Sequence, residues 1–97
     1  MISSWTVSGE TALSIRVRLL CDLSIRLHVF GCSSSLVNPS HGGSVLRVVR
    51  RGRPGEWLGV LAVEHEAGGW VLAWEGNWCR ASQLDQVAQQ VAHRALA

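Results

Sequence analysis

The chain of 97 residues is long enough for one domain, and its 47% hydrophobic content is enough for a modest core. All nine basic residues are arginine, and the net charge of +2 is too small to indicate a nucleic-acid-binding protein by itself. The three cysteines, Cys21, Cys32 and Cys79, exclude a complete disulfide framework because their number is odd, and they predict reduced thiols in the cytosol.

Residues 11–30 are apolar but carry four charged side chains, so no membrane span is expected there. A short repeat fills this segment, because Leu13–Leu19 recurs ten residues later as Leu23–Val29. Apolar side chains at alternate positions predict a β-hairpin over residues 12–30 that turns near Cys21. An amphipathic helix is the alternative, and its apolar positions are Leu13, Val17, Leu20, Leu23, Leu27 and Phe30.

Residues 31–44 are rich in Ser, Gly, Asn and Pro, a composition that predicts a linker. Gly42-Gly43 is what a bacterial ribosome-binding sequence, GGAGG, would encode in this frame. Val45 follows two residues later, and a GTG start codon would encode it. We therefore keep the hypothesis that residues 1–44 are an upstream region outside the native protein.

The sequence from residue 45 onward has the pattern of antiparallel strands. Residues 45–51 predict a first strand, followed by a turn that contains Pro and Gly. Residues 57–65 and 70–78 predict two further strands, joined by a four-residue loop that ends in a Gly pair. A loop of this length puts His65 opposite Trp70 and sets the register of the hairpin.

In this register, side chains from both hairpin strands share one almost wholly apolar face, because side chains alternate along a strand. Arg50 of the first strand then lies opposite Trp57, placed for a cation–π contact. We expect this tryptophan face to carry the core. Its residues are Trp57, Gly59, Leu61, Val63, His65, Trp70, Leu72, Trp74, Gly76 and Trp78.

A C-terminal amphipathic helix is predicted from Ser82, because Ser82 and Asp85 resemble a capping box. Its apolar positions recur at intervals of three and four residues: Leu84, Val87, Ala88, Val91, Ala92, Ala95 and Leu96. The predicted fold class is therefore α+β. We expect a three-stranded antiparallel sheet of order β-β-β-α over residues 45–97 with one C-terminal helix, preceded by the N-terminal β-hairpin.

One helix covers only one face of a three-stranded sheet, and we expect it on the tryptophan face. The opposite face then leaves a contiguous apolar patch in water, which monomeric proteins seldom do. This patch consists of Val45, Val49, Leu58, Val60, Ala62, Val71 and Ala73. We expect these residues to bind a protein partner or a second copy of the chain in a homodimer.

Residues with catalytic or metal-binding chemistry are few. Four side chains of zinc-ligand type lack the close paired spacing of a zinc site, namely Cys21, His28, Cys32 and His41. His65 lies between Glu64 and Glu66, but neighbours on a strand point to opposite faces, so no acid–base pair is expected. Cys79 has no base at a recognisable spacing. The sequence therefore predicts no catalytic residue, no metal and no cofactor.

An alternative function depends on arginines of the first predicted strand and its turn. Basic groups near aromatic side chains can hold single-stranded nucleic acid. Glutamates lie close by, however, and a charged edge strand is the simpler interpretation. Nucleic acid is therefore the second candidate partner, and no membrane partner is expected. The arginines are Arg47, Arg50, Arg51 and Arg53.

The order of features from Val63 onward carries a family resemblance. An acidic turn with glycines precedes Trp70 at the start of a strand, a short Gly-containing link follows, and Ser82 begins a helix with Asp85 soon after. Over residues 45–97 the chain thus resembles the HicB-like antitoxin family. The resemblance implies a partial RNase-H-like β-β-β-α fold, no active site, and inhibition of a toxin by burial. We expect a cytoplasmic, non-catalytic protein-interaction module.

Overall fold

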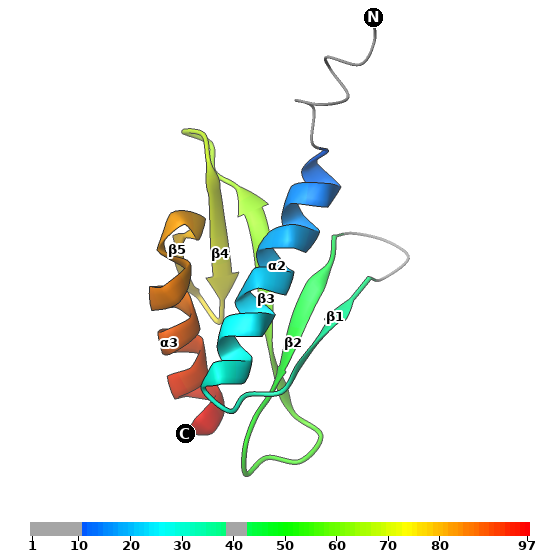
Figure 1. The fold of residues 1–97 in the computed structure, drawn as a ribbon, viewed down its shortest axis with the longest axis vertical. Coiled ribbons are helices and arrows are strands. Elements are labelled where there is room, and N and C mark those ends of the chain that lie inside the picture. Colours follow the sequence, from blue (N-terminus) through cyan, green and yellow to red (C-terminus); the bar gives the residue numbers. More distant parts are fainter. Residues whose placement is uncertain (1–10, 39–42) are drawn as a thin grey trace, which may run out of the picture.

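The computed structural model describes residues 11–38 and 43–97 of the chain. They form two layers, a five-stranded antiparallel sheet and two α-helices on one of its faces (Figure 1). The strands follow one another across the sheet in chain order. The elements are α2 (Ala12–Val29), β1 (Ser34–Val37), β2 (Val45–Val49), β3 (Trp57–Glu64), β4 (Trp70–Trp74), β5 (Asn77–Arg80), the 3-10 turn η1 (Ala81–Gln83) and α3 (Leu84–Leu96).

The β-hairpin predicted for residues 12–30 is wrong, because the segment forms the helix α2. The hydroxyl of Thr11 caps this helix by accepting a hydrogen bond from the backbone N–H of Ser14 at 3.1 Å. The alternating pattern suits a strand, but the apolar side chains that meet the sheet follow helical spacing instead. They are the fully buried Leu20, Leu23 and Leu27.

The segment predicted as a linker, residues 31–44, contains the edge strand β1. Residues 39–42 of this segment lie outside the described residues. The chain leaves α2 through Gly31, whose φ of +85° lies in the left-handed region that glycine tolerates. The N–H of Gly31 donates to the carbonyl of His28 at 2.9 Å, and that of Cys32 to the carbonyl of Leu27 at 3.0 Å. The chain thereby reverses toward the sheet, where β1 pairs with β2. The expectation of a three-stranded sheet with one helix is therefore wrong.

The hairpin of β3 and β4 differs by one residue from the predicted register. The N–H of His65 donates to the carbonyl of Gly69 at 2.9 Å, so the loop consists of Glu66–Gly68 and is one residue shorter than expected. Leu61 consequently pairs with Ala73 and not with the tryptophan that follows it. A slip of one residue exchanges the two faces of a strand. The predicted tryptophan face of β3 therefore points away from the helices.

The predicted strand over residues 70–78 is two strands. β4 ends at Trp74 and β5 begins at Asn77, because Glu75 and Gly76 form a tight hairpin turn. Both turn residues have positive φ, +42° and +79° respectively. The order of residues 45–97 is therefore β-β-β-β-α, with one strand more than the HicB-like resemblance implies.

The hydrophobic core lies between the helices and one face of the sheet. The prediction of a C-terminal helix is confirmed, since α3 follows the turn η1. The predicted capping box is wrong, because the N-cap residue is Gln83 and makes no side-chain cap hydrogen bond. The sheet and α3 contribute Leu46, Val48, Leu58, Val60, Ala62, Leu72, Trp74, Val87, Ala88, Val91, Ala92 and Ala95 to the core.

Candidate functional site

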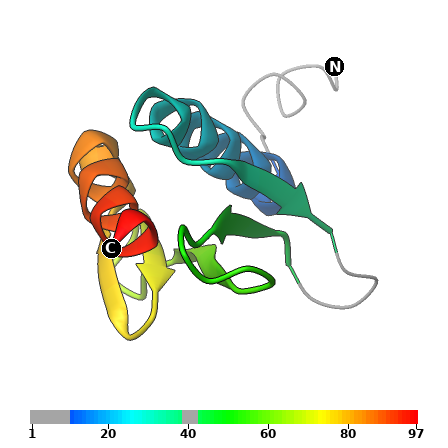
Figure 2. The same ribbon diagram turned by 90° about the horizontal axis from the view of Figure 1, so that it is seen from below.

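The sheet has a second face, on the side away from both helices, which we call the outer face (Figure 2). Side chains alternate along each strand, so the register decides which of them lie on it. In β2 to β5 they are Val45, Arg47, Val49, Trp57, Gly59, Leu61, Val63, Val71, Ala73, Trp78 and Arg80. The two α-helices cover the opposite side chains of the same strands.

Five large apolar side chains of the outer face are exposed to solvent: Val49, Trp57, Leu61, Val63 and Trp78. The two tryptophans are 50% and 57% exposed, in that order. Leu61 pairs with Ala73, and Ala73 pairs with Trp78, so these three side chains form a row across β3, β4 and β5. The outer face thus presents this apolar row and, on the other side of the Arg47–Gly59 pair, a second apolar pair of Val49 and Trp57.

Both exposed tryptophans are held by neighbouring side chains. The guanidinium carbon of Arg47 lies 3.9 Å from the ring centroid of Trp57, a cation–π contact that the sequence assigned to Arg50. The rings of Trp78 and His65 are 5.6 Å apart and inclined by 34°. The Nδ1 atom of His65 accepts a hydrogen bond from the backbone N–H of Ala67 at 3.1 Å, which fixes the imidazole. Rigid aromatic groups with one polar end are typical anchors of interfaces.

The apolar patch predicted for partner binding is divided between two faces. Leu58, Val60 and Ala62 are buried beneath the helices, because the shorter loop shifts the register of β3. The other four residues lie on the outer face: Val45, Val49, Val71 and Ala73. Sequence reasoning missed Trp57, Leu61, Val63 and Trp78 as surface residues. The signal that could have found them is the Gly pair of the loop, which also suits a three-residue turn.

The arginines proposed to bind nucleic acid do not form one patch. They are Arg47, Arg50, Arg51 and Arg53, of which the last three lie at the end of β2 and in the following loop. Arg47 is the member of this set on the outer face. Arg50 is ion-paired with Glu75, and Arg53 with Glu56. Two of these guanidinium groups are therefore already matched by carboxylates.

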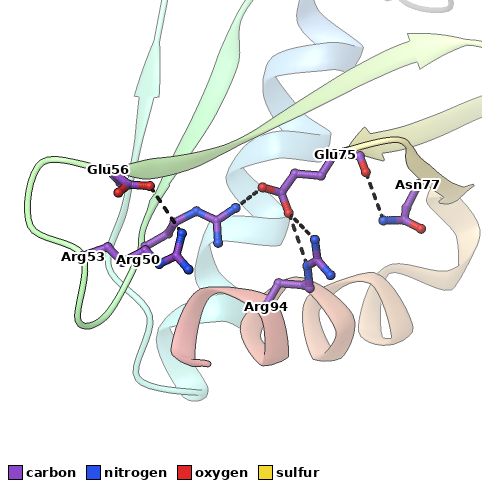
Figure 3. Close-up of polar contacts among 6 residues, drawn as sticks. All are labelled: Arg50, Arg53, Glu56, Glu75, Asn77 and Arg94. Carbon is purple, nitrogen blue, oxygen red and sulfur yellow. Dashed lines mark hydrogen bonds and ion pairs between the residues drawn. The ribbon is translucent and has the colours of Figure 1, made fainter.

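Glu75 is the centre of a polar cluster, which we call the Glu75 cluster (Figure 3). Its Oε1 accepts hydrogen bonds from Nε and Nη2 of Arg94, at 3.2 and 2.9 Å, and its Oε2 accepts one from Nη2 of Arg50. The side-chain amide of Asn77 donates to the Glu75 carbonyl at 3.3 Å. This cluster joins the end of β2, the turn between β4 and β5, and the last turn of α3. Sequence reasoning did not identify it.

A surface hollow of about 420 Å³ adjoins this cluster. It lies between the β4–β5 turn and α3, and its residues come from both elements. Trp74, whose side chain is nearly buried, forms part of its wall. The lining residues are Trp74, Asn77, Gln89, Gln90, His93 and Arg94.

The thiols and histidines considered as ligands do not gather into a metal site within the described residues. All three cysteines are free, and Cys32 is buried. Burial raises the pKa of the Cys32 thiol, and the charge of Arg51 opposes this effect in part. Cys79 donates to Oε1 of Gln83 at 3.2 Å, and His41 lies outside the described residues. Within residues 11–38 and 43–97, no three His, Cys, Asp or Glu side chains gather as a metal site requires.

Comparisons with known proteins assign no family. No protein-family model, no curated protein and no solved structure matches the chain. The resemblance to HicB-like antitoxins therefore stays a prediction. Among the helices that the structure describes, none combines the length and the apolar character needed to cross a membrane. The functional argument therefore depends on the outer face and on the Glu75 cluster.

Proposed function

We propose that the protein is a non-catalytic interaction module whose outer face binds a partner protein with an apolar centre and acidic groups around it. The observation that carries this proposal is the exposure of Trp57, Leu61 and Trp78 on one sheet face. Each half-exposed tryptophan offers on the order of 100 Å² of surface to a partner. Contiguous apolar surface of this kind is typical of protein interfaces.

The charge of the outer face indicates which kind of partner fits. Arg47 and Arg80 lie on it, and among the described strand residues of this face none is acidic. A second copy of the chain would add two more arginines and no strand carboxylate to the interface, which is unfavourable for association. A partner with carboxylates would complement them. An acidic partner protein is therefore favoured over a homodimer.

The side chains of the outer face also favour protein over nucleic acid. Single-stranded nucleic acid is held by aromatic stacking together with a groove of basic groups that follows the backbone. Aliphatic side chains outnumber aromatic ones here, and one face of the Trp57 ring is already occupied by Arg47. Two of the four candidate arginines are ion-paired. These features suit an apolar protein surface better than a chain of phosphates.

Two further proposals accompany this function. A HicB-like antitoxin role requires a protein partner, and the outer face offers a place for one. A cytoplasmic location agrees with three cysteines that are free of disulfides. The partner would then be a protein of the same bacterial cytoplasm.

The test is affinity capture of partners from the source cells with the tagged full chain, its Leu61→Glu variant and a matched Leu13→Glu control. Leu13 lies in α2 and is also exposed, so the control introduces the same charge elsewhere on the surface. We expect Leu61→Glu to lose an acidic partner that wild type and control both retain. Retention of that partner by Leu61→Glu would contradict the proposal. Concentration-dependent dimers that Leu61→Glu abolishes would identify a second copy as the occupant.

A further inference from the structure

The hollow beside the Glu75 cluster has the chemistry of an anion site. Its side chains include the guanidinium of Arg94, the imidazole of His93 and the amide of Asn77, each of which can donate a hydrogen bond. Gln89 and Gln90 add two more amides. Among the described residues that line the hollow, none carries a carboxylate. We infer that this hollow binds the phosphate group of a small phosphorylated solute.

The positive charge of the cluster is only partly neutralised. One carboxylate, that of Glu75, is shared between Arg50 and Arg94, so the three side chains together carry a net positive charge. The Arg50 side chain is 16% exposed, and the Arg94 side chain is 54% exposed. Arg94 is therefore the guanidinium of the pair that an anion from solution can reach.

The contacts of Arg94 fix its orientation. Glu75 binds Nε and Nη2, which leaves Nη1 outside these two bonds. A guanidinium held along one edge presents its other donors in a defined direction, and its planar geometry matches phosphate. Holding a binding group in place before the ligand arrives lowers the entropic cost of binding. Glu75 is thus a positioning residue for Arg94.

The backbone at Glu75 gives independent support for such a role. Its φ of +42° lies in the left-handed region, where Gly, Asn and Asp are favoured and Glu is uncommon. A two-residue turn of this type prefers Asn, Asp or Gly at this position. From this position the Glu75 carboxylate contacts both Arg50 and Arg94. Unfavourable backbone geometry that persists is a reason to look for function at that residue.

The experiment is an NMR titration of the full chain with inorganic phosphate and with glycerol phosphate, against sodium chloride at equal ionic strength. We expect saturable shifts at the Trp74 indole, the Asn77 amide and His93 with both phosphates and not with chloride. Arg94→Gln should weaken this binding roughly tenfold or more, since a charge-assisted contact is lost. Arg53→Gln, which removes another ion-paired and exposed arginine, should leave it unchanged.

The Glu75→Gln variant tests whether Glu75 acts by positioning Arg94 or only through its negative charge. Removing a negative charge alone would tighten phosphate binding, whereas loss of the grip on Arg94 should weaken it. Tighter binding by Glu75→Gln would overturn the positioning role. The proposed phosphate site would be contradicted if chloride caused the same chemical-shift changes as phosphate, or if the changes were the same in Arg94→Gln as in wild type. Changes spread over all arginines would also contradict it. Unchanged signals from core residues such as Leu23 verify that each variant is folded.

Discussion

Glu75 shows how a single residue can oppose the preference of its own backbone. It adopts a positive φ in a turn that favours Asn or Gly, and its carboxylate connects Arg50 to Arg94. The left-handed conformation costs an ordinary residue about 1–2 kcal/mol. Ion pairs at a protein surface return about 0.2–1 kcal/mol each, and the less exposed Arg50 places its pair toward the upper end of this range. Stability alone therefore gives little reason for a glutamate at this position.

Glu75→Asn is accordingly expected to change stability little. Relief of the backbone cost and loss of the ion pairs nearly cancel, so the free energy of unfolding should stay within about 1 kcal/mol of wild type. Urea denaturation of the two proteins measures this difference. Glu56→Gln removes one exposed ion pair without any backbone effect and is the control. A loss of more than about 2 kcal/mol in Glu75→Asn would make the cluster a structural requirement.

The tryptophans of β4 and β5 differ in their contribution to the core. Trp74 is 3% exposed, whereas Trp78 lies on the outer face. Trp74→Ala should cost about 3–5 kcal/mol, because a buried aromatic side chain leaves a cavity. Trp78→Ala should cost less than about 1 kcal/mol, because most of its ring is already in water. If the two substitutions lowered the free energy of unfolding equally in a urea melt, the register predicted from the sequence would be supported instead. In that register Trp74 and Trp78 lie on one face.

The elements differ in how far their sequences determine them. α3 follows helical spacing throughout and was predictable, as were β2 and β3 from their alternating patterns. The sequence of α2 fits both an alternating and a helical pattern, and its burial against the sheet decides for the helix. The loop before β4 contains two glycines, so loops of three and four residues were both compatible with it. The sequence alone does not decide between the two loop lengths. The loop length sets the register of the hairpin, and the register determines which side chains lie on the outer face.

The Glu75 cluster lay beyond sequence reasoning for a different reason. Glu75 occupies a turn position where a glutamate is not expected, so residues 70–78 read as one strand. Its two arginines come from residues 25 positions before it and 19 positions after it. Contacts at such separations depend on the folded arrangement of β2, the β4–β5 turn and α3. Four outer-face residues were nevertheless identified from alternation alone, as Val45, Val49, Val71 and Ala73.

α2 is expected to be an integral part of the fold. Leu23→Ala should cost about 2–5 kcal/mol, because this fully buried side chain leaves a cavity between α2 and its neighbours. Leu13→Ala, at an exposed position of the same helix, should change stability by less than about 0.5 kcal/mol. Thermal or urea denaturation provides both values. Equal small effects would show that the sheet and α3 are stable without α2.

This result also bears on the hypothesis that residues 1–44 lie outside the native protein. Leu20, Leu23 and Leu27 share one core with β2, β3 and α3, and β1 extends the sheet at β2. Removing these residues would expose apolar surface on the inner face of the sheet as well as on the outer face. N-terminal sequencing of the native protein decides the hypothesis. A peptide from residues 1–44 would end it.

The whole molecule combines a covered face and an open face. Two α-helices cover the inner face of the sheet (Figure 2). On the outer face, the exposed residues include Trp57, Trp78, Arg47 and Arg80. The core lies on the inner face, so the exposed side chains of the outer face contribute little to it. The outer face can therefore be altered without unfolding the protein, which is what a binding surface requires. The hollow beside the Glu75 cluster is lined by other residues than those of the outer face, so phosphate binding can be tested independently.

Site-specific photo-crosslinking in the source cells tests the central claim most directly. A photoreactive aromatic residue replaces Trp78 on the outer face in one full-length variant and Leu13 on α2 in the other. The account predicts a crosslink to an acidic protein from position 78 and not from position 13. Adding Arg47→Glu to the position-78 variant should abolish that crosslink. The account would be contradicted if position 78 gave no adduct, or if it gave an adduct with a second copy of the chain or with RNA. The same adduct from positions 78 and 13 would also contradict the account.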